Sequence, residues 1–183
     1  ENISFTNLNL ETRLHTGDWW GNGEPIKISA IRGRDTVPGA IRNVHFSNVT
    51  CNSENSVYIY AAPECTVENI DFTNFDFHLK QSQLDKIGGG NIDLRPTSVP
   101  EKEFYASNTP IFYVENAKNI RLSNGTMSWG DNVTQPYFTA PVEAIDVNTL
   151  SIDRVTASPS PANPSAPLVI AKECTNLENH INK

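Results

Sequence analysis

The chain has 183 residues, the size of one domain, and a formal net charge of −7 at pH 7. The acidic balance argues against nucleic acid as a partner, because that binding depends on Lys and Arg contacts with phosphates. No run of about eighteen apolar residues occurs, so no membrane-spanning helix is predicted. The 10 glycines and 12 prolines, and the lack of apolar residues at helical spacing, disfavour a helical fold.

A six-residue phrase returns along the chain. It reads Asn-Ile-Ser-Phe-Thr-Asn at residues 2–7, recurs at residues 43–48, 69–74 and 119–124, and has an eroded copy at residues 149–155. Apolar and polar residues alternate within each copy, which is the period of a β-strand buried on one face. The phrase therefore predicts a set of related strands.

A second apolar strand follows most copies of the phrase. These strands are predicted at residues 25–28, 56–60, 110–114, 141–145 and 167–170. Two strands per repeat, joined by loops of irregular length, are typical of a solenoid. We therefore expect an all-β fold, a right-handed parallel β-helix of about five irregular coils, with residues 1–183 as a single domain.

Stacked coils would place equivalent residues about 4.8 Å apart. We expect the apolar residues of the phrases to point inward and stack, namely Ile3, Phe5, Val44, Phe46, Ile70, Phe72, Ile120 and Leu122. The asparagines that close the phrases are expected to adopt left-handed geometry and to hydrogen-bond along the stack, namely Asn7, Asn48, Asn74 and Asn124. Tyr58 and Tyr60 alternate with apolar neighbours, so we expect them on the outside as a flat exposed strip.

The first phrase begins without a polar cap before it. We therefore expect that the chain was cut from a larger multidomain protein, or that a neighbour covers this end. No basic segment followed by an apolar one opens the chain, so a signal peptide is absent or removed. Cys51, Cys65 and Cys174 fit no zinc spacing, and we expect free buried thiols, with a Cys51–Cys65 bridge as the alternative.

Residues 11–31 hold the adjacent Trp19 and Trp20, between Thr-Arg-Leu and a Gly-Glu-Pro-Ile strand. This string resembles a coil of bacterial glycoside hydrolase family 28 proteins, the polygalacturonase-like pectinases. The similarity continues in short motifs at residues 39–44, 89–96, 114–117, 129–132 and 137–138. It covers nearly the whole chain and matches the C-terminal half of that family.

The resemblance implies a β-helix and a sugar-related function, but not the family's catalysis. The catalytic half of the family carries Asn-Thr-Asp, Asp-Asp, Gly-His-Gly and Arg-Ile-Lys motifs, and none of them occurs in this sequence. Inverting glycoside hydrolysis needs an acid and a base about 6.5–9.5 Å apart. We therefore assign no catalytic residue.

Aromatic and cationic side chains are the candidates for ligand binding. An exposed indole offers a flat apolar plate to a sugar ring, which suggests roles for Trp19, Trp20 and Trp129, with Tyr137 beside the last. Four cations could hydrogen-bond sugar hydroxyls or pair with a uronate, namely Arg13, His15, Lys27 and Arg95. The alternatives are that the aromatic residues anchor loops and that the cations are simply solvated.

Residues 80–109 form the longest irregular stretch, and such loops often carry function. No His, Asp and Glu cluster has metal spacing, so we expect no cofactor and leave open only a loop calcium ion held by oxygen ligands.

These observations favour a non-catalytic carbohydrate-binding module that recognises plant cell-wall polysaccharide, either xylan or pectin. We expect it to be secreted or on the cell surface, linked to catalytic domains, with an oligosaccharide or polysaccharide as partner and no contact with nucleic acid or membrane. The alternatives are the C-terminal part of a family 28 hydrolase and a structural or adhesive solenoid.

Overall fold

The structure is a computed structural model that describes residues 1–15, 21–33, 35–36, 38–95, 97 and 104–183. The described chain is all-β apart from one helical turn, α1 (Asp85–Gly88). The strands are β1 (Ile3–Glu11), β2 (Lys27–Ala30), β3 (Ile41–Ser53), β4 (Val57–Ala61), β5 (Val67–Leu79), β6 (Asn91–Asp93), β7 (Phe104–Ala106), β8 (Phe112–Trp129), β9 (Val142–Ala157), β10 (Val169–Lys172) and β11 (Thr175–Asn182).

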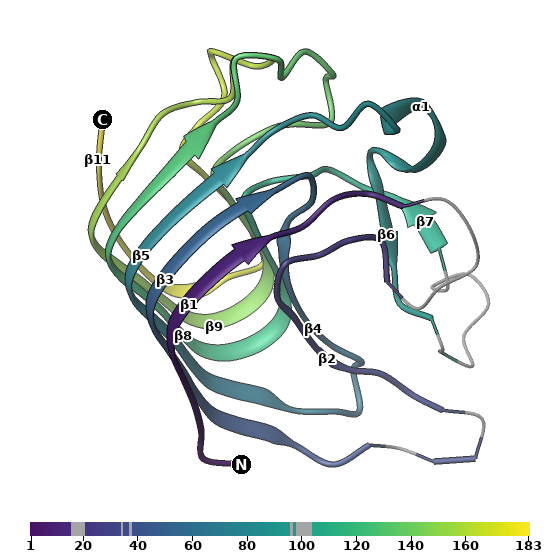
Figure 1. Ribbon diagram of the computed structural model, residues 1–183. Coiled ribbons are helices and arrows are strands. Elements are labelled where there is room, and N and C mark those ends of the chain that lie inside the picture. Colours follow the sequence, from purple (N-terminus) through teal and green to yellow (C-terminus); the bar gives the residue numbers. More distant parts are fainter. Residues whose placement is uncertain (16–20, 34, 37, 96, 98–103) are drawn as a thin grey trace.

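Nine of these strands form one large parallel sheet, which Figure 1 shows as a stack of curved ribbons in chain order. We call the order β1-β3-β5-β8-β9-β11 the first ladder and the order β2-β4-β8-β9-β10 the second ladder. β8 and β9 belong to both, because their N-terminal residues pair in the second ladder and their C-terminal residues pair in the first. The all-β prediction is confirmed, and the stacked parallel sheet is consistent with a β-helix.

The predicted inward residues lie in two columns of the first ladder. Strand pairing aligns Phe5 with Phe46, Phe46 with Phe72 and Phe72 with Leu122, and the column beside it runs from Ile3 to Ile120 in the same way. Six of the eight residues are at most 5% exposed, as expected.

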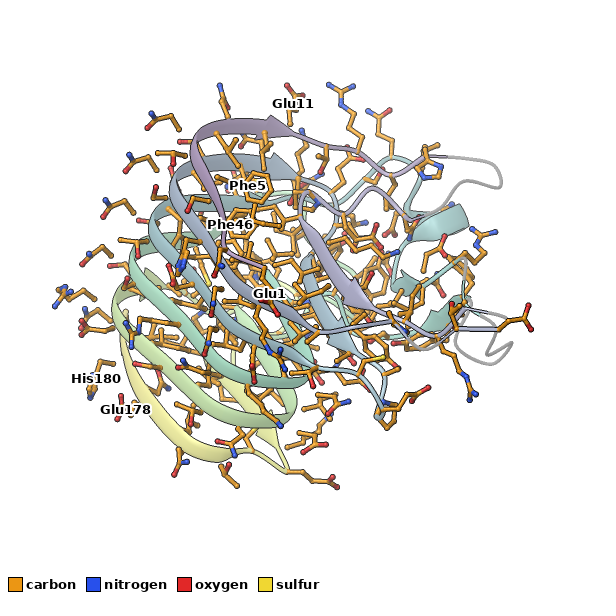
Figure 2. All side chains as sticks on the ribbon, turned by 90° about the horizontal axis from the view of Figure 1, so that it is seen from below. Glu1, Phe5, Glu11, Phe46, Glu178 and His180 are labelled. Atoms are coloured by element: carbon orange, nitrogen blue, oxygen red, sulfur yellow. The ribbon has the colours of Figure 1, made fainter. Side chains whose placement is uncertain are left out.

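The other two, Ile3 and Phe5, correct that expectation, because they are 44% and 41% exposed. They face the same column as the rest, and the Phe5 ring stacks on Phe46 with centroids 4.9 Å apart (Figure 2). However, β1 is an edge strand with β3 as its neighbour, so no described strand covers its other side.

Asparagines at positive φ form two ladders between the strands. The closing asparagines have φ between 53° and 58°. Asn48 donates to Asn7 at 3.0 Å and Asn74 to Asn48 at 3.2 Å, which confirms the predicted hydrogen bonds for these three. Asn124 has the predicted left-handed geometry but accepts a hydrogen bond from Arg154 at 2.6 Å instead. The opening asparagines of the phrases form a second, tighter ladder: Asn43 donates to Asn2 at 2.8 Å, Asn69 to Asn43 at 2.8 Å and Asn119 to Asn69 at 2.7 Å.

Asn69 tests how this ladder contributes to stability, because it has φ of 57° and makes two ladder hydrogen bonds. Asn69→Gly keeps the backbone geometry accessible and loses both bonds, so we expect the free energy of unfolding to fall by about 1–2 kcal/mol. Asn69→Ala adds a left-handed backbone penalty of about 1 kcal/mol. Urea unfolding of the two variants measures both effects, and equal losses would contradict the backbone contribution.

The excursion at residues 80–109 corrects the prediction for the tyrosine strip. Tyr58 and Tyr60 do point to the outer face of the second ladder, but they are only 1% and 5% exposed. The antiparallel β6–β7 hairpin packs over this face, where Ile92 and Leu94 join the tyrosines in a second small core. Figure 1 shows the hairpin beside β2 and β4. Elsewhere, all three cysteines are free, with Cys51 buried and the other two partly buried.

Candidate functional site

A cleft of about 570 Å³ lies on the outer face of the second ladder, next to the part that the β6–β7 hairpin covers. We call it the acidic cleft. Its lining comes from the five strands of the second ladder or their ends, from the loop after β4, and from Leu94 and Thr97 after β6. The cleft therefore runs along the direction in which the strands stack.

The floor of the acidic cleft is one row of outward side chains. Strand pairing places Tyr60 of β4 beside Glu115 of β8, and Glu115 beside Ile145 of β9. The preceding residues of β8 and β9, Val114 and Ala144, point into the core and are fully buried. Since side chains alternate along a strand, burial of one row of residues turns the next row toward the cleft.

The far side of the floor is a second row, formed by Asn116, Asp146 and Glu173. They follow one another on neighbouring strands and have φ of 53°, 50° and 55°. Asn116 donates to the carbonyl oxygen of Ala61 at 2.9 Å, which fixes the corner. Left-handed geometry is uncommon outside glycine, and Asn and Asp adopt it more readily than Glu. The repeated corner aligns an amide and two carboxylates at the strand spacing of about 4.8 Å.

Tyr60 is a largely buried side chain of the cleft with a polar end. Its side chain is 5% exposed and its ring packs on Tyr58, with centroids 6.1 Å apart. Among the described residues, its hydroxyl makes no hydrogen bond. Burial, with the nearby carboxylates of Glu115 and Glu64, raises the pKa of Tyr60 to about 12. The hydroxyl therefore stays protonated at neutral pH and is available as a donor.

The carboxylates of the cleft are held at different places around this hydroxyl. Glu115 accepts a hydrogen bond from the Tyr113 hydroxyl at 2.7 Å, so its position is fixed. Glu64 lies on the opposite rim, 3.8 Å from the guanidinium of Arg32. The arrangement offers hydrogen-bond acceptors both on the floor and in the loop after β4.

Buried ion pairs fix the elements that border the cleft. Asp93 of β6 is fully buried, and Arg95 donates to its carboxylate at 2.7 Å while its guanidinium lies 5.7 Å from the centroid of the Phe104 ring. On β9, Glu143 is 2% exposed and accepts from Lys172 at 3.0 Å and Asn108 at 2.8 Å. Removing either cation would leave a buried charge, so these pairs constrain the local geometry.

The cations named from the sequence lie outside the acidic cleft. Arg13 is exposed and pairs with Glu11 at 2.9 Å. His15 Nε2 lies 2.9 Å from the carbonyl oxygen of Gly21, and Lys27 donates to the carbonyl oxygen of Asp93, whose carboxylate binds Arg95. The structure therefore brings Lys27 and Arg95 together at Asp93. Sugar binding by these cations stays a prediction.

The predicted aromatic plates divide into two groups. Trp19 and Trp20 lie outside the described residues. Trp129 belongs to the core at 8% exposure, and its Nε1 donates to the carbonyl oxygen of Ser158 at 2.9 Å. Tyr137 packs on Phe138 with ring centroids 4.6 Å apart, and its hydroxyl is buried. These contacts fit the alternative that Trp129 and Tyr137 anchor loops.

The acidic cleft was missed at the sequence level, although part of its signal was present. Asn116 and Asp146 lie at equivalent positions after predicted strands and share the left-handed conformation that was expected of the closing asparagines. Extending the corner argument to them would have aligned Asn116 with Asp146. The burial of Tyr60 depends on the hairpin, so the sequence pattern did not contain it.

Within the described ranges, no group of three or more His, Cys, Asp or Glu is arranged to hold a metal ion. A loop calcium ion stays a prediction. The described chain also contains no helix long and apolar enough to cross a membrane. Comparisons with protein-family models, with curated proteins and with solved structures found no match to this chain. The function is therefore argued from the acidic cleft itself.

Proposed function

We propose that this protein is a non-catalytic carbohydrate-binding module that recognises a plant cell-wall polysaccharide through the acidic cleft. The observation that carries the proposal is the Tyr60 hydroxyl at the floor of a cleft of about 570 Å³: it makes no hydrogen bond with another described residue, and its side chain is only 5% exposed. Ligand sites combine apolar surface with a few convergent polar groups, and this cleft has both. A sugar oxygen would give the Tyr60 hydroxyl the acceptor that it lacks.

The direction of the cleft supports a chain-like ligand. Asn116, Asp146 and Glu173 present equivalent positions on successive strands, about 4.8 Å apart. This spacing is comparable with the length of one sugar unit in an extended polysaccharide. Ile31, Pro63 and Ile145 add apolar surface to the lining, against which the C–H face of a sugar ring can pack.

The proposal includes the finer architecture, a right-handed parallel β-helix of about five irregular coils. Two parallel ladders that share β8 and β9 support it, because a chain that returns repeatedly to the same two ladders in order must wind as a coil. Parallel crossovers are right-handed in nearly all proteins. We further propose a secreted or cell-surface protein in which this module accompanies catalytic domains.

Affinity electrophoresis in gels that contain xylan, β-glucan or pectin tests the binding function. We expect wild-type protein to be retarded by at least one of them. Tyr60→Phe removes only the hydroxyl and should lower affinity roughly threefold to tenfold, the worth of one hydrogen bond. Glu115→Ala should also weaken retention, because it removes an acceptor from the floor.

Glu178→Ala is the matched control for Glu115→Ala, because Glu178 is exposed on β11 (Figure 2) and does not line the cleft. It should bind as wild type does, and unfolding curves confirm that each variant is folded. Loss of retention in Trp19→Ala or Trp20→Ala, but not in the cleft variants, would move the site to those tryptophans. No retention of wild-type protein on any plant polysaccharide would refute the binding function.

The four carboxylates of the cleft make the hydrolase alternative testable in the same samples. We expect no release of reducing sugar from xylan or polygalacturonate, because the family 28 catalytic motifs are absent from the sequence. Release that disappears in Glu115→Gln would instead identify an enzyme whose carboxylates lie in the acidic cleft.

A further inference from the structure

We infer that the acidic cleft selects uncharged polysaccharides, such as the xylan or glucan backbone, and rejects polyuronates. This inference rests on the proposed carbohydrate-binding function and narrows its ligand class. It departs from the pectin that the family resemblance implies. Its basis is the charge around the Tyr60 hydroxyl at the floor of the cleft.

The cleft has an excess of negative groups. Among the described lining residues, Glu64, Glu115, Asp146 and Glu173 are acidic and Arg32, which lies 3.8 Å from Glu64, is the one cation. Neither the Asp146 nor the Glu173 side chain makes a hydrogen bond or ion pair with another described residue. A uronate carboxylate bound on the floor would therefore face several like charges, which disfavour binding at short range.

The cations on the neighbouring strands are already engaged. Lys172 pairs with Glu143 at 3.0 Å, Arg95 pairs with Asp93 at 2.7 Å, and Lys27 donates to the carbonyl oxygen of Asp93. Glu143 is 2% exposed, and Asp93 is fully buried. Moving Lys172 or Arg95 to a uronate would leave those buried carboxylates unpaired, which is strongly unfavourable.

An uncharged sugar meets the same groups without this conflict. Its hydroxyls can donate to Glu115, Asp146 and Glu173, since ionised carboxylates only accept hydrogen bonds. Its oxygens can accept from the Tyr60 hydroxyl, whose pKa of about 12 keeps it protonated. The donor and acceptor pattern of the cleft thus matches a neutral polyhydroxylated chain.

A matched pair of ligands isolates the charge effect. Polygalacturonate and its highly methyl-esterified form share a backbone and differ in carboxylate charge. Retention is measured on both, and on xylan and β-glucan, with a chelator present so that calcium cannot bridge carboxylates. We expect polygalacturonate to bind at least about tenfold more weakly than the tightest neutral polymer, and more weakly than its esterified form.

The variant Asp146→Asn/Glu173→Gln removes two charges while keeping side chains of similar shape, and Asn tolerates the left-handed backbone. This variant should bind polygalacturonate more tightly, relative to the neutral polymer, than wild-type protein does. Added salt should have the same effect on wild-type protein, because it screens the repulsion between carboxylates. Polygalacturonate bound by wild type as tightly as xylan or glucan would overturn this inference and leave the carbohydrate-binding function standing. Absence of binding to every polymer would instead refute that function, and the inference with it.

Discussion

Phe72→Ala is expected to lower the free energy of unfolding by about 3–5 kcal/mol. The Phe72 ring is fully buried and lies between three other rings: it stacks on Phe46 at 4.5 Å between centroids and meets Phe77 and Phe112 edge-on at 6.2 Å and 5.1 Å. Truncation removes the buried apolar surface and leaves a cavity in a column held by strands on both sides. Urea unfolding, followed by circular dichroism and by fluorescence, measures the loss.

Phe5→Ala is the matched control, because Phe5 occupies the same column at the edge of the sheet and is 41% exposed. It contacts one ring, Phe46, so its truncation should cost only about 1 kcal/mol. Similar losses of unfolding free energy for the two variants would show that the Phe72 ring is no better buried than the Phe5 ring. Coincident transitions by both probes are required before the values are compared, since repeated strands can unfold in parts.

Gly125→Ala is expected to destabilise the protein by about 1–3 kcal/mol through overpacking. Gly125 is in register with Phe75 on β5, and a Cβ atom at this glycine would lie 2.4 Å from the nearest ring atoms of Phe75. That ring cannot move aside easily, because it is 4% exposed and packs on Phe77 and Phe112 with centroids 5.6 Å away.

A double variant tests whether this clash is the cause. Phe75→Leu makes room at the position opposite Gly125, so Gly125→Ala should cost less in that background than in wild type. Gly39→Ala is the control substitution, because a Cβ there meets no atom within 4 Å, and it should change stability by less than about 0.5 kcal/mol. Strictly additive losses for the double variant would contradict the proposed contact.

The repeated phrase determined most of the strand architecture. Alternation within each phrase identified the buried column of Phe46 and Phe72, because the period of two is a local property of extended chain. The sequence also predicted the left-handed corner conformation of Asn48 and Asn74, because asparagine tolerates positive φ whatever its neighbours are. These inferences needed no knowledge of which strands become neighbours.

Only the tertiary structure decided what covers each face. Alternation correctly predicted that the Tyr60 side chain points away from the main core. Its burial, however, depends on the β6–β7 hairpin, which packs over the second ladder. Phe5 carries the same pattern as Phe72 but remains exposed because β1 is an edge strand. Alternation fixes the side to which a residue points, whereas exposure depends on packing by distant segments.

The acidic cleft, too, is determined partly by local sequence and mostly by the tertiary structure. Glu115 and Ile145 are neighbours because of strand register, and register across loops of irregular length is set by the packing of the whole stack. Glu64 and Leu94 reach the cleft from two loops whose placement no local pattern specifies. The sequence alone determined strands, inward columns and asparagine corners, because these depend on nearby residues. The site depends on contacts between distant segments, so only the folded chain assembles it.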